Sequence, residues 1–534
     1  MSSTGKGLPI VGDQAYYRTT SRVGLRHARR AVQLVMLVLF LALFLVTRDQ
    51  GLAPLPPTLF LQTDPLVALL TIGAARVLVP SLLVGSLFFV LFTLVFGRAF
   101  CGWICPLGTL FDLTNRALKT PEDRVPLAWH TKLQYAKYLI LVVMVAGALC
   151  SAQWLYLLDP LVLLFRALAV GVWPVATLAH DDPEAQGTLW QAFHGVTFGP
   201  LALLAATLAA VAIAPRSYCR YLCPLGAFYG LLSRAPLLRR RVEGCDACTG
   251  VQTQKQCVAG CRMGAVAQNP HLTQNHECIR CMSGRSFCHA QAIHFDVEPR
   301  TVLRQDPEDV PAAISRRAFL ASAGAGLALA PMAALSSAPR NPDTGVVRPP
   351  GVLDEDAFTD QCIRCAMCVQ ACPTQTLQLT HLEAGFTAFW TPAITPAVGG
   401  CVPECNACSV ACPTDAIPDF AKDERSKWAT KMGTAVLEKG RCISHTEDTP
   451  CAKCLDICPT KAFVVESEGA RTPRRPEAVD YVRCVGCGLC ELECAKIVYG
   501  TPALRTFAHG RGQLTALHEA PTTSFSAPTI APAD

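Results

Sequence analysis

Apolar stretches alternate with charged segments over the first 220 residues, whereas the last 200 residues are polar and rich in cysteine and proline. Four stretches are long enough to predict membrane spans: Ala31–Thr47, Val77–Gly97, Tyr135–Ser151 and Gly199–Pro215. Two shorter stretches, Leu66–Ala75 and Leu161–Leu178, follow an Asp-Pro pair and predict half-helices or interfacial segments. The pattern predicts an α-helical membrane domain followed by polar domains.

The distribution of lysine and arginine predicts the orientation of this membrane domain. Basic residues gather before residue 31, between 98 and 137 and between 216 and 241, and acidic residues gather in the other loops. Because positive charge favours the cytoplasmic side, residues 1–30, 98–134 and 216–314 are predicted to be cytoplasmic and residues 340–534 periplasmic. The formal net charge is +6, but it flanks apolar stretches. We therefore expect a multi-pass protein of the bacterial inner membrane and no nucleic-acid partner.

The membrane domain, residues 31–226, is internally duplicated. Thr63–Val67 recurs as Leu158–Val162, and a Cys-x3-Cys-Pro-Leu-Gly motif occurs twice. Residues four apart share one face of a helix, so we expect one cytoplasmic site from the cysteines of both motifs: Cys101, Cys105, Cys219 and Cys223. Metal binding, thiol–disulfide chemistry and contact with a cluster are open roles for this site, and simple packing at helix ends is the alternative. Cys150 is expected to be a buried small residue.

Sixteen cysteines fall into four motifs in the polar C-terminal part, residues 353–500. They are Cys362, Cys365, Cys368 and Cys372; Cys401, Cys405, Cys408 and Cys412; Cys442, Cys451, Cys454 and Cys458; and Cys484, Cys487, Cys490 and Cys494. The first and fourth motifs have Cys-x2-Cys-x2-Cys spacing, the second and third have a first gap of three and eight residues, and in all four the last cysteine follows four residues after the third. Such spacing is typical of ferredoxins that hold 4Fe–4S clusters. Zinc sites need no such third and fourth cysteine, and disulfides do not fall into such triplets. The spacing predicts four 4Fe–4S clusters in a periplasmic α+β domain, and it leaves the pairing of the motifs open.

A second cysteine-rich region, residues 240–300, predicts a cytoplasmic ferredoxin-like pair of sites. In two-cluster ferredoxins the fourth cysteine of each motif serves the other cluster. One cluster is therefore expected on four cysteines: Cys245, Cys248, Cys257 and Cys288. The other site has Cys261, Cys278 and Cys281, with Gly284 at the position of the missing thiol. A 3Fe–4S cluster, a cubane with a different fourth ligand and an empty site are all open for it.

A twin-arginine signal in the middle of the chain predicts export of the C-terminal part. Ser315-Arg316-Arg317-Ala318-Phe319-Leu320 precedes a mildly apolar run, and together they predict a signal or fifth span over residues 315–337. Such a pathway exports folded domains that already hold their clusters. Residues 338–352 are expected to be a linker and residues 513–534 a disordered tail.

The order of these motifs identifies a family. The membrane part resembles NapH and MauN, the membrane ferredoxin-type proteins, and is similar to the membrane core of NosR-type proteins. The exported part resembles NapG and MauM in the Cys362 motif, in Arg348-Pro349-Pro350-Gly351 and in Gly433-Thr434-Ala435. The chain thus looks like a fusion of the two, and the resemblance implies a quinol dehydrogenase that feeds a periplasmic cytochrome or reductase.

The motifs that the sequence lacks also bear on its function. The chain has no Cys-x-x-Cys-His haem motif and no glycine-rich nucleotide loop before a helix, so we expect no terminal catalytic centre of its own. The alternative function is a maturation factor that binds or reduces a metal for a periplasmic enzyme.

Overall fold

The structure is a computed structural model of the chain. It describes residues 20–48, 55–118, 127–151, 153–178, 198–234, 236–242, 260–266, 273–288, 292–297, 316–335, 346–429, 431–447, 449–465, 475–498 and 501–511. The expected tail and most of the expected linker lie outside these ranges.

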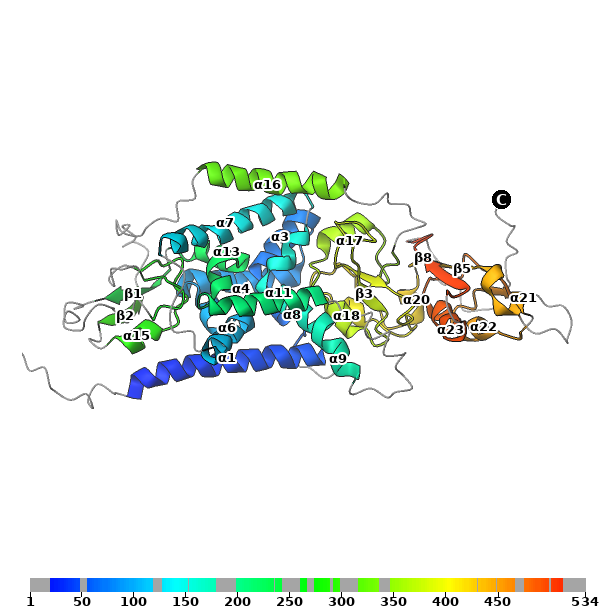
Figure 1. Cartoon of the computed structure of the whole chain (residues 1–534), viewed down its shortest axis with the longest axis horizontal. Coiled ribbons are helices and arrows are strands. Elements are labelled where there is room, and N and C mark those ends of the chain that lie inside the picture. The colour runs from blue at the N-terminus through cyan, green and yellow to red at the C-terminus, as the bar shows by residue number, and fades with distance from the viewer. Residues whose placement is uncertain are drawn as a thin grey trace, which may run out of the picture. The chain divides into compact units, whose positions relative to one another are not determined.

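Long apolar helices occupy the predicted spans (Figure 1). They are α1 (Thr20–Val46), α4 (Pro80–Phe96), α7 (Leu127–Leu149) and α11 (Phe198–Ala209), which continues into a 3₁₀ turn at Ala210–Ala212. Two segments, His27–Val46 and Lys132–Leu149, are long and apolar enough to cross a membrane, and the other two helices are apolar but shorter. Their outward-facing leucine, valine and phenylalanine side chains are exposed in the protein alone, which supports association with a membrane. The twin-arginine segment forms helix α16 (Arg316–Leu335).

The chain divides into two compact units, and each long helix of the membrane part except α16 contributes to both. Unit 1 contains residues 1–40, 89–138 and 208–314, and unit 2 contains residues 41–88, 139–207 and 315–534.

Unit 1 is built around the two Cys-x3-Cys-Pro motifs. In each motif a short helix, α5 (Ala99–Trp103) or α12 (Ser217–Tyr221), is followed by a second helix, α6 (Pro106–Ala117) or α13 (Pro224–Leu232). The second cysteine is the N-cap of the second helix and the proline is its first residue. The expectation that both cysteines of a motif share one helix is therefore wrong, because the chain turns between them.

A small ferredoxin-like part completes unit 1. Strand β1 (Leu238–Val242) pairs antiparallel with β2 (Ile293–Val297), and helix α15 (Ser283–Phe287) precedes β2. Cys288 is buried against this sheet with Ala292 and Ile293. The described residues thus contain the strand pair expected of an α+β ferredoxin domain.

Two short helices in unit 2 begin at the repeated Asp-Pro-Leu, as the sequence predicts. They are α3 (Pro65–Ala75) and α8 (Pro160–Ala167), and α8 continues through a π-helical turn (Leu168–Val172) into α9 (Trp173–Leu178). In both cases the aspartate is the N-cap, and its Oδ1 accepts hydrogen bonds from the next two free backbone N–H groups. Cys150, just after α7, is exposed, so the expectation of burial is wrong: it lies in the turn beyond the packed helix.

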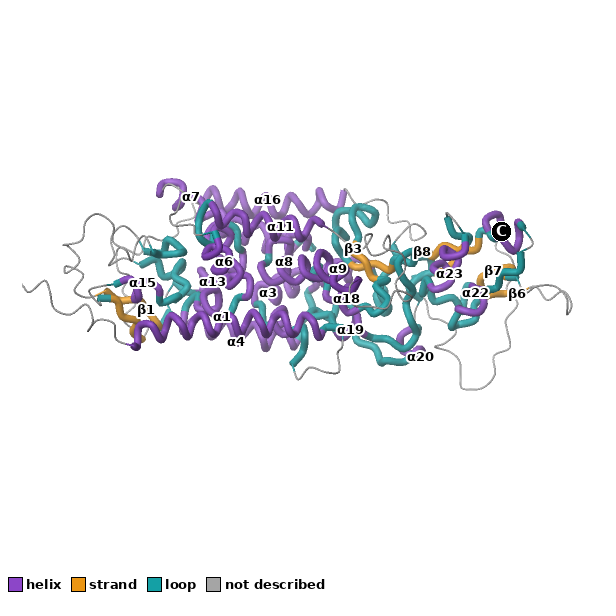
Figure 2. The backbone as a smooth tube through the Cα atoms, turned by 60° about the horizontal axis from the view of Figure 1, so that its bottom comes forward, coloured by secondary structure: helices purple, strands orange, loops and turns teal. Residues whose placement is uncertain are grey.

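The polar part of unit 2 consists of loops connected by short helices and strands (Figure 2). Its strands form three antiparallel pairs: β3 (Leu377–Leu379) with β4 (Pro392–Ile394), β5 (Thr434–Leu437) with β8 (Leu504–Phe507), and β6 (Phe463–Val465) with β7 (Pro476–Val479). Short helices stand between the cysteines: α17 (Glu355–Gln361), α18 (Met367–Ala371), α19 (Ala407–Val410), α20 (Glu424–Lys427), α21 (Ile443–Thr446), α22 (Lys453–Ile457) and α23 (Leu489–Ile497). Two buried clusters form the core of this part, and in them cysteines such as Cys362 and Cys454 pack among apolar side chains such as Trp428 and Ile417.

Unit 1 contains a buried ion cluster at Glu277. Its carboxylate accepts hydrogen bonds from Arg98 (2.8 Å), Lys137 and Tyr138 (3.1 Å), and all of these side chains are buried. Burial acts to raise the pKa of Glu277, but Lys137 and Arg98 outweigh it and hold this pKa at about 2. The cluster ties helix α7 and the segment before α5 to the ferredoxin-like part.

We predict that Glu277→Gln destabilises unit 1 by about 3 kcal/mol, because two buried cations lose their counter-charge. The ordinary pKa of Glu277, 4.5, lies above its folded value, so its contribution is complete above that pH and is lost as the pH falls from about 5 to about 2. Amide hydrogen exchange of α5 and α13 in the full chain measures both effects. Glu438→Gln, which breaks only an exposed pair with Arg441, is the control and should change exchange little. Equal exchange in both variants would contradict the prediction.

Candidate metal centres

The sixteen C-terminal cysteines converge in four sets of four. Three sets line cavities: set B is Cys372, Cys401, Cys405 and Cys408; set C is Cys442, Cys451, Cys454 and Cys494; set D is Cys458, Cys484, Cys487 and Cys490. The remaining cysteines form set A, in which Cys412 is an electrostatic neighbour of the thiols that precede it in the first motif: Cys362, Cys365 and Cys368.

The sets show how the motifs pair, which spacing alone left open. The fourth cysteine of each motif leaves its own triplet: Cys372 joins the second motif and Cys412 joins the first. Cys458 and Cys494 exchange in the same way between the third and fourth motifs. This exchange is the arrangement of two-cluster ferredoxins, and it occurs here twice.

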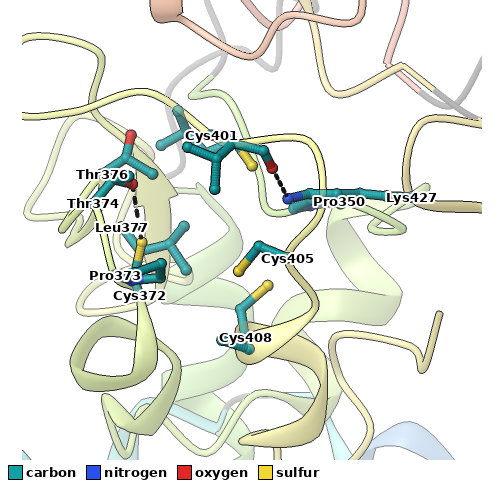
Figure 3. Close-up of a pocket in the computed structure, with 13 residues that line it drawn as sticks. Pro350, Cys372, Pro373, Thr374, Thr376, Leu377, Cys401, Cys405, Cys408 and Lys427 are labelled. Carbon is teal, nitrogen blue, oxygen red and sulfur yellow. Dashed lines mark hydrogen bonds between the residues drawn. The ribbon is translucent and has the colours of Figure 1, made fainter. Parts of the chain in front are cut away.

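The cavities fit an iron–sulfur cluster. Set B lines a partly open pocket together with side chains such as Leu377 and Ile394. In Figure 3 the sulfur atoms of Cys405 and Cys408 point into this space, and Cys372 faces them from the other side. Lys427 closes one edge, where its Nζ donates a hydrogen bond to the carbonyl of Val402. Four thiols around a pocket next to a cation match the needs of an anionic cluster.

Backbone geometry around the cysteines repeats from motif to motif. In the first motif Arg364 and Ala366 have positive φ, and in the fourth motif Gly486 and Gly488 have positive φ at the same positions. These left-handed residues bend the chain so that successive cysteines face one point. The third residue after the fourth cysteine also has positive φ in three motifs: Gln375, Asp415 and Lys461.

Burial decides the protonation of these thiols. It raises the pKa of Cys408 and Cys490 well above the usual value, and it raises that of Cys401 to about 11 although Lys427 acts in the opposite direction. Without a metal the buried cysteines would therefore be neutral thiols at pH 7. Backbone N–H groups are already directed at the sulfurs, as from Ala462 to Cys458 and from Ala435 to Cys484, both at 3.3 Å. These donors favour the thiolate that a bound cluster requires.

The two Cys-x3-Cys-Pro motifs also bring their thiols together, as set M in unit 1. Cys105 has Cys101 and Cys219 as electrostatic neighbours, and Cys223 has the other three. Cys105 and Cys223 are buried at the N-termini of α6 and α13, where Gly108 and Gly226 direct backbone N–H groups at their sulfurs. Burial raises the pKa of both thiols, and these N–H donors act in the opposite direction, toward the thiolate that a metal would bind.

Two buried arginines in equivalent positions of the repeat neighbour set M. Arg98 and Arg216 each stand three residues before the first cysteine of a motif. Arg216 donates hydrogen bonds to the Cys101 carbonyl and to both carboxylate oxygens of Asp112, all at 2.9 Å. Arg98 pairs with Glu277. Neither arginine was predicted from the sequence to lie at this site, although the repeat places both at equivalent positions.

An incomplete site, with three cysteines, lies beside set M. Cys261, Cys278 and Cys281 pack around Met263, Ala265 and Ile279 together with Cys101 and Cys219. The Cys278 loop has the ferredoxin backbone, with positive φ at Arg280 and Met282, and Gly264 corresponds to the left-handed residue after a fourth cysteine. Gly284 supplies no thiol, although a side chain there would meet only Ile293 at 3.7 Å. Cys245, Cys248 and Cys257 lie outside the described residues.

Comparisons with known proteins point to the same chemistry. A family described as a 4Fe-4S binding domain matches residues 78–122 and 196–243, which contain both Cys-x3-Cys-Pro motifs, and another of the same description matches residues 358–378. The chain is 32% identical to the methylamine utilization ferredoxin-type protein MauM of Paracoccus denitrificans over 213 residues, which are 37% of this chain and 90% of MauM.

Two further relatives carry other names. The ferredoxin-type protein NapG of Escherichia coli is 34% identical over 35% of this chain and 78% of its own length. The regulatory protein NosR of Pseudomonas aeruginosa is 32% identical over 37% of this chain and 25% of its own length. No solved structure matches the chain.

We predict that serine substitutions group by set and not by motif. Cys368→Ser and Cys412→Ser should remove the same electron paramagnetic resonance signal, because both cysteines belong to set A. Cys372→Ser should instead share its defect with Cys405→Ser of set B, although it lies in the same motif as Cys368. Cys150→Ser, outside all sets, is the control. A shared defect of Cys368→Ser and Cys372→Ser, with Cys412→Ser distinct from both, would contradict this pairing.

Proposed function

Because the chain belongs to the family of ferredoxin-type proteins that includes MauM and NapG, we propose that it is a membrane-bound quinol dehydrogenase. Its role as an iron–sulfur electron-transfer protein follows from the family and from the 4Fe-4S binding domains. The quinone pool would be its donor and a periplasmic cytochrome or reductase its acceptor. Clusters bound at the cysteine sets would supply one-electron carriers between the two.

The observation that carries the proposal is the order of the cysteine sets. Sets A and B share the first two motifs, and sets C and D share the last two. Sets B and D meet where the Cys401 N–H donates to the Cys487 carbonyl at 2.8 Å, and Cys487 packs against the core that holds sets A and B. The sets thus form the series A, B, D, C.

The first member of this series adjoins the apolar helices of unit 2. Gln370, in helix α18 between Cys368 and Cys372, donates a hydrogen bond to the carbonyl of Phe44, which lies in α1. Arg166 of α8 donates through Nε to the carbonyl of Arg364 at 2.6 Å, inside the Cys362–Cys365 loop. Set A is therefore the one placed to take electrons from a donor held among those helices, and set C is the one placed to pass them on.

The division into units supports the proposed topology. The segments that the charge bias assigns to the cytoplasm, 98–134 and 216–314, all fall in unit 1. Residues 340–534 and the loops on the other side of the spans fall in unit 2. Such a division is expected of a membrane protein with a domain on each side.

Set M deepens the proposal on the cytoplasmic side. Its four thiols lie within the segments that match a 4Fe-4S binding domain, which favours a cluster over thiol–disulfide chemistry. We propose five four-cysteine cluster sites with described geometry, A to D and M, besides the sites of residues 240–300.

We predict that a water-soluble quinol, duroquinol, bleaches the cluster absorbance of the purified full chain. In the variant that combines Cys105→Ser with Cys223→Ser, the absorbance change on reduction by dithionite should be smaller by the contribution of one cluster. The clusters of sets A to D should be unaffected. Cys150→Ser should behave like the native chain. A native chain that dithionite reduces but duroquinol does not would overturn the quinol dehydrogenase and leave a maturation factor as the better function.

We also predict that export of unit 2 depends on the twin arginines. Arg316→Lys combined with Arg317→Lys should leave a reporter fused after residue 511 inaccessible to an external protease on spheroplasts. Arg441→Lys combined with Arg505→Lys, which changes two exposed arginines of the exported part, is the matched control and should stay accessible. Accessibility of both double variants would remove the basis for export through this segment.

A further inference from the structure

The two aspartates of the repeated Asp-Pro-Leu meet in the interior of unit 2. Asp64 and Asp159 are both at most 1% exposed. The Oδ1 atom of each caps its helix, and the Oδ2 atom of each receives no hydrogen bond from an N–H or O–H group of the described residues. The two carboxyl groups instead interact with each other. Helix capping therefore uses one oxygen of each aspartate and leaves the second pair of oxygens unexplained.

A buried pair of this kind holds a proton. Two carboxylates in contact in an apolar interior do not both ionise, and a proton on one oxygen supplies the hydrogen bond that the other lacks. Burial raises the pKa of Asp64 well above its usual value, with Asp159 acting in the same direction. Burial also raises the pKa of Asp159, to about 6. At neutral pH the pair therefore consists of a protonated Asp64 and an ionised Asp159.

Few other polar groups face this pair. Tyr156 donates its hydroxyl to the Val67 carbonyl at 3.2 Å and lies 3.1 Å from the Thr71 hydroxyl, so it stands beside the pair from the turn before α8. The charged groups that act on the pair or on Tyr156 are two arginines, Arg166 from α8 and Arg364 from the Cys362–Cys365 loop.

Arg166 connects the pair to cysteine set A. It is fully buried, and its terminal nitrogens Nη1 and Nη2 have no hydrogen-bond partner among the described residues. Its guanidinium lies 5.1 Å from the centre of the Trp390 ring, and its Nε binds the Arg364 carbonyl. Asp159 on one side and the thiols of Cys362 and Cys365 on the other act on its charge. A change of charge at set A is therefore felt at the pair through this buried cation.

We propose that the Asp64–Asp159 pair is the proton acceptor for quinol oxidation at set A. This inference rests on the proposed function and adds the group that receives a proton. A quinol loses two electrons and two protons when its two O–H bonds break and the quinone forms. Clusters held by the cysteine sets would accept the two electrons, while one proton binds the Asp159 carboxylate and the other passes to water. Asp159 then releases its proton to water, which restores the singly protonated pair.

The substitution Asp159→Asn tests the proposal without removing the helix cap, because asparagine is an equally good N-cap. Duroquinol should reduce the clusters of the variant about a hundredfold more slowly, as expected when a positioned proton acceptor is lost. The native rate should rise as the pH increases through about 6, because the acceptor is the ionised form, and Asp159→Asn should lose this rise. Asp64→Asn keeps the ionisable partner and replaces one neutral hydrogen-bond donor by another, so it should retain the rise at about the same pH.

Asp354→Asn is the matched control. Asp354 caps helix α17 with the same pair of backbone hydrogen bonds, but its bonds are exposed and it is not part of the pair. It should leave both the rate and its pH dependence unchanged. Dithionite, which delivers electrons without a quinol proton, should reduce all variants equally and so verify that the clusters are assembled.

An infrared difference spectrum gives a readout that does not depend on turnover. Duroquinol added to the native chain should produce a protonated-carboxyl band that shifts in D₂O and is absent from Asp159→Asn. The proposal is overturned if duroquinol reduces Asp159→Asn at the native rate with the native pH dependence, or if that band persists in the variant. Failure of duroquinol to reduce the native chain would instead reject the quinol dehydrogenase itself, so the two failures are distinguishable.

Discussion

The structure depends on the cost of burying sulfur ligands. A thiolate taken into an apolar interior is unstable unless a metal, a cation or N–H donors compensate its charge, and most cysteines of the five sets are buried or half-buried. Two devices meet this cost. Backbone N–H groups point at sulfurs such as Cys223, Cys458 and Cys484, and buried basic residues such as Arg216 lie next to the sets. In the loops of unit 2 the cysteines pack together with apolar side chains such as Trp428 and Val485, so the sulfur positions and the apolar core are built together.

The buried arginines near set M need counter-charges of their own when no metal is bound. A buried guanidinium without a counter-charge would destabilise unit 1 whenever the site holds no metal. Arg216 is tied to Asp112, and Arg98 is tied to Glu277. Burial acts to raise the pKa of Asp112, but Arg216 and Arg262 outweigh it and keep that pKa below its usual value. Each arginine therefore has a buried counter-charge, which it shares with other basic residues: Asp112 also pairs with Arg29 and Arg262, and Glu277 also pairs with Lys137.

The sequence predicts which cysteines form the sites better than it predicts the backbone geometry around them. The spacing predicts the cysteines of sets A to D as cluster ligands, and the duplication predicts one site from the thiols of set M. The structure brings the thiols of each set together, and cluster binding at these sets stays a prediction. The break between Cys101 and Cys105 was not predicted, because their four-residue spacing also fits one continuous helix, whereas Cys105 caps a new helix that begins at Pro106. The ferredoxin rule predicts that a fourth cysteine serves another cluster, but which motifs exchange theirs was not predictable, because the pairing of Cys372 and Cys412 depends on how α18 and α19 pack. Buried partners such as Glu277 lie 140 residues from Lys137 in the chain, and no local pattern connects them.

The Cys278 loop explains why a ferredoxin motif can lose a thiol and keep its form. Its left-handed residues Arg280 and Met282 repeat those of intact motifs although Gly284 offers no ligand. The loop is instead held by α5: Trp103 donates its indole N–H to the Arg280 carbonyl at 2.9 Å, and the Ile279 carbonyl lies so close to Gly102 that any side chain there would collide with it. The loop thus forms a wall of set M as well as part of its own site. This second role constrains its backbone independently of how many cysteines it carries, so the incomplete motif retains a structural function even where its own cluster is altered.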